Sequence, residues 1–230
     1  MPKLEAVVEG IYELDEFPWP QTNCLAPDHM RVHPAMSDED IGFVIACLLR
    51  SREPYQKTDA KHAFQEIIDG YGLIWFGGIR TVDEENGLVI NPGCCCGLET
   101  WWEWLKFVTE GGDYGPWLGH DPNPGVEQTP WGYRVWSGLP EGFRELEVLP
   151  DDVKQYFIDF QGDELKLQVE QVQRDLIGFL EAVRVWAFKI DPELAEALVQ
   201  KIDEQFSITN PYRNFPYDYW SAPNWSREGQ

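Results

Sequence analysis

Three consecutive cysteines are the residues of this chain best suited to chemistry. Cys94, Cys95 and Cys96 lie in the run NPGCCCGLETWWEW, between the end of an apolar segment and the start of a helical pattern. Backbone N–H groups at the start of a helix favour negative charge, so a thiol placed there should have a lowered pKa and a reactive thiolate form. The run therefore indicates a nucleophilic or redox cysteine. The alternative interpretation is steric, because cysteine is also a compact hydrophobe that fits a tight turn.

His120 and Asp121 form the second candidate group, in the run WLGHDPNPGVE. Histidine is the usual general base near neutral pH, and a carboxylate beside it in space could orient the imidazole. Together with one cysteine of positions 94–96, these residues would make a Cys-His-acid set for nucleophilic catalysis. The spacing leaves open whether the side chains meet. An ordinary turn is the alternative, because Asp-Pro and Asn-Pro pairs are typical of turns.

Neither a metal nor a cofactor is expected from the sequence. Three consecutive side chains point in different directions and do not easily supply three corners of a tetrahedron. The spaced C-x-x-C pattern of zinc sites is absent. The phosphate-loop, dinucleotide-binding, H-E-x-x-H and G-x-S-x-G motifs are also absent.

Local signals place two helices before the cysteines. Ser37 is a suitable N-cap with Asp40 in the capping-box position, which predicts a helix from there to about Arg50. A second helix is expected over about residues 58–69, because apolar residues recur there at helical spacing before a glycine.

Strand signals flank the cysteine run. Residues 73–76 and 88–90 are apolar, and the Asn86-Gly87 turn between them predicts a β-hairpin. Residues 98–110 are expected to form a helix, and residues 133–136 are the best candidate for a further strand.

The final third of the chain carries the strongest periodicity. There, apolar residues recur at helical spacing up to the Asp191-Pro192 pair, which interrupts them. A second helix is expected over residues 194–206. The two helices should form a hairpin that packs on the sheet. A seam between two copies is the alternative, so the expected state is a monomer or a homodimer through residues 165–190. The apolar residues alternate at intervals of four and three, an a/d pattern: Leu165, Val169, Val172, Leu176, Phe179, Val183, Trp186 and Ile190.

These elements predict an α+β fold in a single domain over residues 1–230. A small antiparallel sheet, built from residues 70–92 and 133–136 with the N-terminal arm, would carry helices on one face. The C-terminal helical hairpin would pack beside it. The expected parts are a sheet-containing part over about residues 1–150, a helical part over 151–206 and an aromatic strap over 207–230.

Composition excludes several classes of protein. The chain has 230 residues, of which 43% are hydrophobic, and this excludes wholesale disorder. The 18 Lys and Arg against 40 Asp and Glu give a formal net charge of −22, which disfavours binding to nucleic acids or anionic membranes. We see no secretory signal and no apolar run long enough to span a bilayer. The five cysteines are an odd number and a poor disulfide framework, so we expect a cytoplasmic protein.

Two segments resemble sequences of known proteins. GCCCGLE and GHDPNPGVE are similar to segments of bacterial proteins with no assigned activity, and this resemblance implies no activity here. The acidity, the tryptophan content and the lack of a catalytic motif make the chain similar to immunity proteins of bacterial toxin systems. That second resemblance implies binding to a basic toxin.

Two functional hypotheses follow from these observations. The first is an acidic cytosolic protein-binding module, not an enzyme, that captures a basic protein partner, with immunity to a cationic toxin as one concrete form. The alternative is a thiol-dependent enzyme that uses a cysteine of positions 94–96 with His120 and Asp121. The distance between the sulfurs and the His120 ring discriminates between them. Convergence in an open cleft favours chemistry, whereas a buried and separated arrangement favours a structural role.

Overall fold

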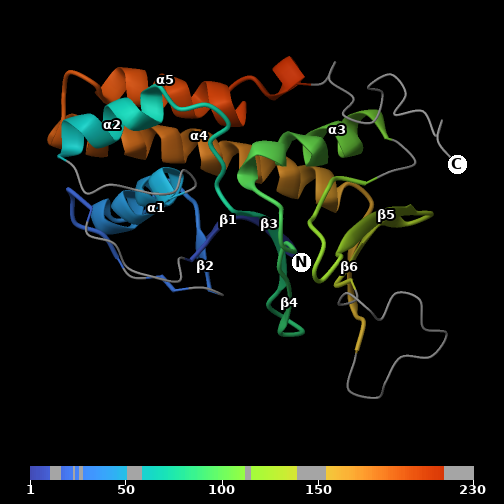
Figure 1. Ribbon diagram of the computed structural model, residues 1–230. Coiled ribbons are helices and arrows are strands. Elements are labelled where there is room, and N and C mark those ends of the chain that lie inside the picture. The colour runs from blue at the N-terminus through green and yellow to red at the C-terminus, as the bar shows by residue number, and fades with distance from the viewer. Residues whose placement is uncertain are drawn as a thin grey trace, which may run out of the picture.

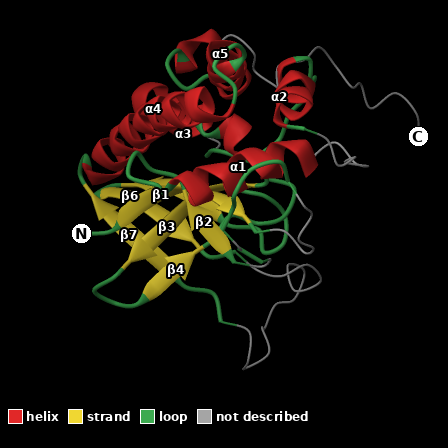
Figure 2. Cartoon of the chain, turned by 90° about the vertical axis from the view of Figure 1, so that its left-hand side faces the viewer, coloured by secondary structure: helices red, strands yellow, loops and turns green. Residues whose placement is uncertain are grey.

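Two small antiparallel sheets lie beneath a layer of helices in the computed structural model of the chain (Figure 1). Figure 2 shows the helices covering one face of the strands, which confirms the predicted α+β class. The structure describes residues 1–10, 17–22, 24–25, 28–50, 59–111, 115–138 and 154–214. No helix among these residues is both long and apolar enough to cross a membrane.

The first sheet contains four strands in the order β2-β1-β3-β4, all antiparallel. β3 and β4 form the predicted hairpin around the Asn86-Gly87 turn, and β1 shows that the N-terminal arm belongs to the sheet, as expected. The bounds are β1 (Lys3–Glu9), β2 (His29–Arg31), β3 (Gly77–Asp83) and β4 (Leu88–Ile90).

The hairpin begins later in the sequence than its apolar residues suggest. Residues 73–76 were expected to form the first strand, but β3 starts at Gly77. Leu73 and Trp75 are instead buried in the core, and the Trp75 indole N–H donates to the Val44 carbonyl at 2.8 Å. These two apolar side chains therefore pack in the core against a helix, and their segment does not pair as a strand.

The predicted strand over residues 133–136 belongs to a second sheet, which corrects the expectation of a single sheet. β6 (Gly132–Trp136) lies between β5 (Gly125–Thr129) and β7 (Phe157–Gln161). The outer strands have weak sequence signals because each has only five residues, and β5 is mostly polar or small. β7 does alternate, with Ile158 and Phe160 buried, and it corrects the expectation that residues 151–206 are helical throughout. Arg134 fixes the pairing of β6 with β7 through two hydrogen bonds to Asp159, of 2.7 and 2.9 Å.

Capping residues set the starts of α1 (Asp38–Arg50) and α2 (Ala60–Ile68), as predicted. The Asp40 N–H donates to Ser37 Oγ at 3.1 Å, and the Ser37 N–H donates to Asp40 Oδ2 at 3.4 Å, which completes a capping box. Asp59 caps α2 by accepting a backbone N–H of its first turn at 2.9 Å.

The helix expected after the cysteines starts later than predicted. A short 3₁₀ turn, η1 (Leu98–Thr100), precedes α3 (Trp102–Glu110). α3 ends at Gly111, where a φ of +70° suits glycine. The first full helical turn is therefore separated from the cysteines.

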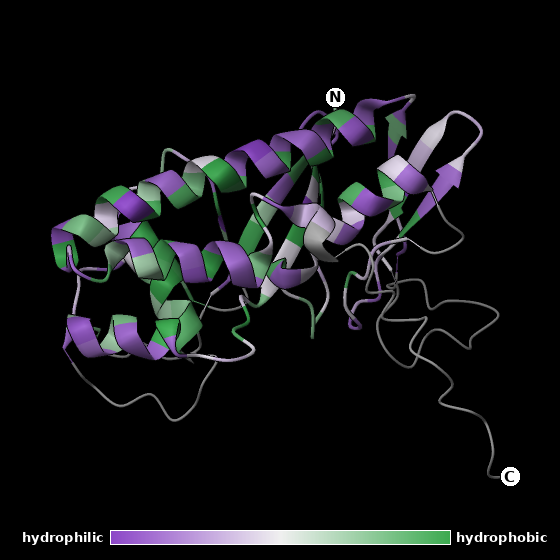
Figure 3. Ribbon diagram, turned by 90° about the horizontal axis from the view of Figure 1, so that it is seen from above, coloured by the Kyte–Doolittle hydropathy of each residue, from purple (hydrophilic) through white to green (hydrophobic). Residues whose placement is uncertain are grey.

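α4 (Glu164–Ile190) and α5 (Ala195–Phe206) form the predicted C-terminal hairpin, and α4 contacts β1, β6 and β7. In Figure 3, hydrophobic and hydrophilic residues alternate along α4. Seven of the eight a/d side chains are buried within one chain, so they pack against the rest of the same molecule, as expected for a hairpin that packs on the sheet. A homodimer through residues 165–190 is not tested by this burial. The oligomeric state itself stays a prediction. The a/d residues exposed by 2% or less are Leu165, Val169, Val172, Leu176, Phe179, Val183 and Trp186.

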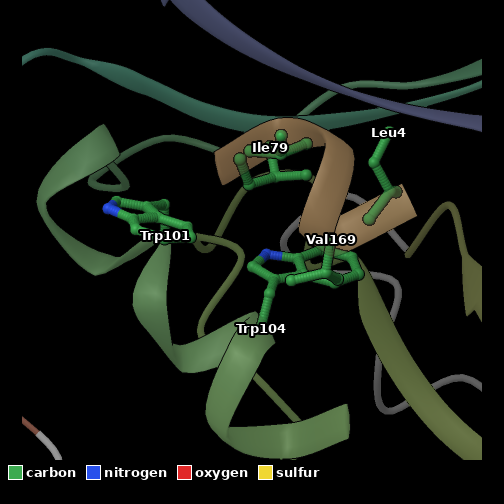
Figure 4. A pocket seen from close by; sticks show the side chains of 6 residues that line it. Leu4, Ile79, Trp101, Trp104 and Val169 are labelled. Carbon is green, nitrogen blue, oxygen red and sulfur yellow. The ribbon is translucent and has the colours of Figure 1, made fainter. Parts of the chain in front are cut away.

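Tryptophans fill the space between the sheets and the helices. Trp75 stacks on Phe206 with ring centroids 4.1 Å apart, and Trp101 donates its indole N–H to the Phe206 carbonyl at 2.9 Å. A narrow apolar gap remains beside them (Figure 4), but it has no room for a water molecule and is not a ligand site. It is lined by Leu4, Ile79, Trp101, Trp104, Val169 and Val172.

The aromatic strap predicted over residues 207–230 is described only as far as residue 214. Ile208 is buried, and η2 (Pro211–Asn214) contacts α3. The described start of the segment therefore packs on the body of the protein. The rest of the prediction lies outside the described residues.

Candidate functional site

The cysteine loop, residues 91–97, is held against the segment that leads into β3. The Gly77 N–H donates to the Cys96 carbonyl at 3.1 Å, and the Leu98 N–H donates to the Trp75 carbonyl at 3.0 Å. These bonds fix the end of the loop to the four-stranded sheet, so the preceding cysteines have a rigid support.

A second loop, residues 117–123, pairs with the cysteine loop. The Gly93 N–H donates to the Leu118 carbonyl at 2.7 Å, and the His120 N–H donates to the Cys94 carbonyl at 3.0 Å. The two runs that the sequence analysis singled out separately therefore lie side by side.

Two glycines allow the loops to approach this closely. Gly119 has a φ of +96°, and a Cβ there would lie 2.5 Å from the carbonyl carbon of Gly93. A Cβ on Gly93 would lie 3.0 Å from the backbone nitrogen of His120. A side chain at either position would push the loops apart, so the contact requires glycine at both.

The sulfurs of Cys94 and Cys95 and a ring nitrogen of His120 all lie within 4.8 Å of one another. All three side chains are exposed. Successive side chains of an extended chain point to opposite sides, but Cys95 has a φ of +60°, which is uncommon for a residue other than glycine. This turn in the backbone brings two neighbouring thiols to one side of the loop. We call these three residues the thiol–imidazole cluster.

Trp117 supports the thiol–imidazole cluster from its side. Its ring contacts the His120 ring edge-on, with centroids 4.7 Å apart, and its indole N–H donates to the Cys95 carbonyl at 3.4 Å. Its backbone N–H donates to Glu103 Oε2 of α3 at 2.7 Å. Neither residue was predicted from the sequence as part of a site. The available signal was the tryptophan in WLGH, whereas no spacing pointed to Glu103.

The two exposed thiols interact directly. Cys95 forms a side-chain hydrogen bond with Cys94, and this bond, together with the charge of Cys94, raises the pKa of Cys95. Cys95 therefore holds its proton more firmly than a free cysteine does. The lowered pKa expected for a thiol of this run is not found at Cys95.

Cys96 lies outside the thiol–imidazole cluster. Its side chain is 5% exposed, and its Sγ donates to the Trp117 carbonyl at 3.6 Å. Burial, with a smaller effect from the negative charge of Glu99, raises the pKa of Cys96 to about 12. The thiol therefore stays protonated near neutral pH. Cys96 fits the steric interpretation of the run and not that of a nucleophile.

Asp121 is exposed and is joined to Pro122 by a cis peptide bond. Within the described part of the chain, its carboxylate does not belong to the group of side chains that lie within 4.8 Å of one another. The structure thus brings together the sulfur and imidazole members of the predicted Cys-His-acid set, and the acid is not part of that contact.

Two half-buried carboxylates lie beneath the cysteine loop. Burial raises the pKa of Glu99 and of Glu103, although the N–H of Trp117 partly opposes the shift at Glu103. Glu99 Oε2 is buried and makes no hydrogen bond to the described residues. Ionisation of Glu99 is therefore unfavourable in the folded protein.

The thiol–imidazole cluster is suited to two kinds of chemistry. A thiol beside an imidazole can give up its proton and act as a nucleophile. Two sulfurs and one ring nitrogen are also typical ligands of thiophilic metal ions. Three consecutive thiols do not easily supply three corners of a tetrahedron, but two thiols and a histidine from another loop do not have that restriction.

Comparison of the chain with protein-family models, with curated proteins and with solved structures gave no match. The resemblances to bacterial proteins and to immunity proteins therefore stay predictions, and the candidate site stands on its own geometry.

Proposed function

We propose that the protein carries out thiol–disulfide exchange at Cys94, assisted by His120 and Cys95. The observation that supports this proposal most is the exposed cluster, in which both sulfurs and an imidazole nitrogen lie within 4.8 Å of one another. Exchange requires a sulfur that a disulfide can approach. An exposed loop provides that access without an enclosed pocket, even for a bulky substrate.

The proposed step begins with transfer of the Cys94 thiol proton to the His120 imidazole. The Cys94 thiolate attacks one sulfur of the substrate disulfide, a new S–S bond forms to that sulfur, and the original S–S bond breaks. The departing thiolate takes the proton from the His120 imidazolium. The Cys95 thiol, whose sulfur lies within 4.8 Å of that of Cys94, would stabilise the Cys94 thiolate as a neighbouring S–H donor.

The test measures the reaction of the reduced, metal-free chain at pH 7 with oxidised glutathione and with an aromatic disulfide that releases a coloured thiolate. We expect Cys94 to react about tenfold faster than free cysteine, and His120→Asn to slow it about tenfold or more, because a general base contributes on that scale. Cys94→Ser should abolish the fast phase.

Two control variants accompany this test. Cys96→Ser should keep the fast phase because that thiol is buried, and His62→Asn should keep it because His62 is an exposed histidine of α2, away from the cluster. The proposal fails if Cys94 reacts no faster than free cysteine, or if the fast phase survives in Cys94→Ser.

We infer a second candidate function from the charge of the molecule: the cytosolic capture of a basic protein, of which toxin immunity is one form. The 40 acidic residues exceed the 18 basic ones by so many that more than half cannot be paired one to one. The resulting negative surface would attract a basic partner over long range. At least seven basic side chains already have acidic partners: Lys3, Arg31, Lys61, Arg80, Arg134, Arg184 and Lys189.

The capture function is tested by the salt dependence of association. Polylysine and a small basic protein serve as probes in stopped-flow measurements. We expect the association rate constant to fall about tenfold or more between roughly 50 and 500 mM salt, because exposed charges are screened over a few ångströms at the higher concentration. An association rate that does not change with salt contradicts electrostatic capture.

A further inference from the structure

We propose that Cys94, Cys95 and His120 form a binding site for a thiophilic metal ion, with Zn²⁺ as the natural occupant. The two sulfurs and one ring nitrogen would be its three protein ligands. This inference goes beyond thiol–disulfide exchange, because holding an ion requires only the three donor atoms and no reaction.

The geometry is close to what a tetrahedral ion requires. Zn–S bonds of about 2.3 Å and Zn–N bonds of about 2.0 Å place neighbouring ligand atoms roughly 3.5–3.8 Å apart. The three donor atoms already lie within 4.8 Å of one another. Rotations of exposed side chains by roughly 1 Å at the donor atoms therefore suffice.

The backbone holds the ligands in place before any ion binds. The hydrogen bond from the His120 N–H to the Cys94 carbonyl, 3.0 Å long, joins the histidine to the first cysteine. The Trp117 ring lies edge-on to the imidazole, and its indole N–H donates to the Cys95 carbonyl. A preorganised site loses less conformational entropy when it binds its ligand.

The donor set selects the chemical class of the ion. Two thiolates and an imidazole suit zinc and similar ions, whereas magnesium and calcium require oxygen ligands. Two thiolates also neutralise the charge of one divalent ion. Among the described residues no other histidine, cysteine or carboxylate belongs to the group. A tetrahedral ion would therefore take its fourth ligand from solvent or from a bound molecule, as at open zinc sites.

Metal binding and thiol exchange would compete for the same sulfurs. A sulfur that is bound to an ion is not available to attack a disulfide, so Zn²⁺ should protect the thiols from exchange and from alkylation. The metal-free protein would then be the reactive form.

The test titrates the reduced, metal-free full chain with Co²⁺, which reports its ligands by absorption, and then displaces Co²⁺ with Zn²⁺. We expect one Co²⁺ per chain, a thiolate-to-cobalt charge-transfer band and the visible bands of tetrahedral cobalt. Cys94→Ser, Cys95→Ser and His120→Ala should each weaken binding about tenfold or more, because each removes one of three protein ligands.

Cys24→Ser and His62→Ala are the matched controls, since neither residue belongs to the group. They should bind Co²⁺ like the wild type, and circular dichroism should show that all variants are folded. The absence of a charge-transfer band, or a spectrum unchanged by His120→Ala, would overturn the three-ligand site. A normal cobalt spectrum with slow disulfide exchange would remove the proposed exchange function and leave the metal site in place.

Discussion

The long helix α4 and the two loops of the thiol–imidazole cluster are positioned by different interactions. α4 is held by apolar side chains such as Phe179, which is fully buried and contacts Trp75 with ring centroids 5.9 Å apart. The loops are held by backbone hydrogen bonds and by close contact between Gly93 and Gly119, and their cysteine and histidine side chains are exposed.

This difference separates stability from chemistry within the molecule. Burial of apolar surface is the main favourable contribution to the free energy of unfolding, and α4 supplies much of it. The candidate site depends instead on the backbone conformation of a few loop residues. We therefore expect changes in α4 to lower stability and spare the site, and changes in the loops to affect the site more than stability.

Phe179→Ala should have the largest effect on stability. We expect the free energy of unfolding, measured by urea titration, to fall by about 3–5 kcal/mol, because the substitution leaves a cavity in the core. Ile177→Ala, at a position of the same helix that is 38% exposed, should cost less than about 1 kcal/mol. Cobalt binding by the folded fraction should be unchanged in both variants. An altered cobalt spectrum in Phe179→Ala would show that the two regions are coupled.

Cys96 should be alkylated far more slowly than its neighbours. A thiol with a pKa of about 12 is almost fully protonated at pH 8, so we expect its rate to be about a hundredfold or more below that of free cysteine. Because the pKa is raised, the rate should still increase with pH near about pH 10, where free cysteine has levelled off. Iodoacetamide labelling with peptide mapping measures this. Equal labelling of Cys96 and Cys94 would contradict the buried environment.

Gly119→Ala should disturb the loops more than the core. The new Cβ would meet the backbone of Gly93, so we expect cobalt binding to weaken about tenfold and the free energy of unfolding to fall by about 1–3 kcal/mol. Gly87→Ala is the control, because Gly87 also has a positive φ, +65°, but a Cβ there meets nothing within 4 Å. If both variants bind cobalt equally well, contact between the glycines does not position the site.

Glu99→Gln should have the smallest effect, and it should stabilise the protein. Burial raises the pKa of Glu99, so the wild type gains stability as the pH falls through that pKa towards 4.5 and loses it as the pH rises. At pH 8 the variant lacks the buried charge, and its free energy of unfolding should be about 1 kcal/mol higher.

The gain from Glu99→Gln should shrink between pH 8 and pH 5, because the wild-type carboxylate then takes up a proton. Glu110→Gln, at an exposed position at the end of α3, is the control and should change stability at neither pH. A gain of the same size at both pH values would show that the buried charge is not its cause.

Elements that depend on neighbouring residues could be predicted from the sequence. The capping pair Ser37 and Asp40, the Asn86-Gly87 turn and the a/d pattern of α4 each act over a few residues, and all three appear in the structure as predicted. The strands β5 and β7 could not be predicted, because each has only five residues and is defined by its pairing with β6.

The candidate site could be predicted only in part. The residue types at Cys94, Cys95 and His120 drew attention to the right two loops, because thiols and imidazoles are reactive wherever they stand. The sequence did not distinguish Cys96 from its neighbours, although burial gives it a different pKa. It also did not predict Trp117 and Glu103 as supports, because their hydrogen bonds involve backbone atoms and join different elements.

The sequence by itself determined where the main helices lie, where a hairpin turns, and that the chain carries a large excess of negative charge. These properties follow from composition and from residues that are close together in the chain. Only the tertiary structure decided that there are two sheets among the described residues, that Cys96 is buried, and that two cysteines meet a histidine from a distant loop. The physical reason is that those outcomes depend on long-range backbone pairing, on glycine contacts and on the left-handed conformation of Cys95, none of which has a periodic signature in the side chains.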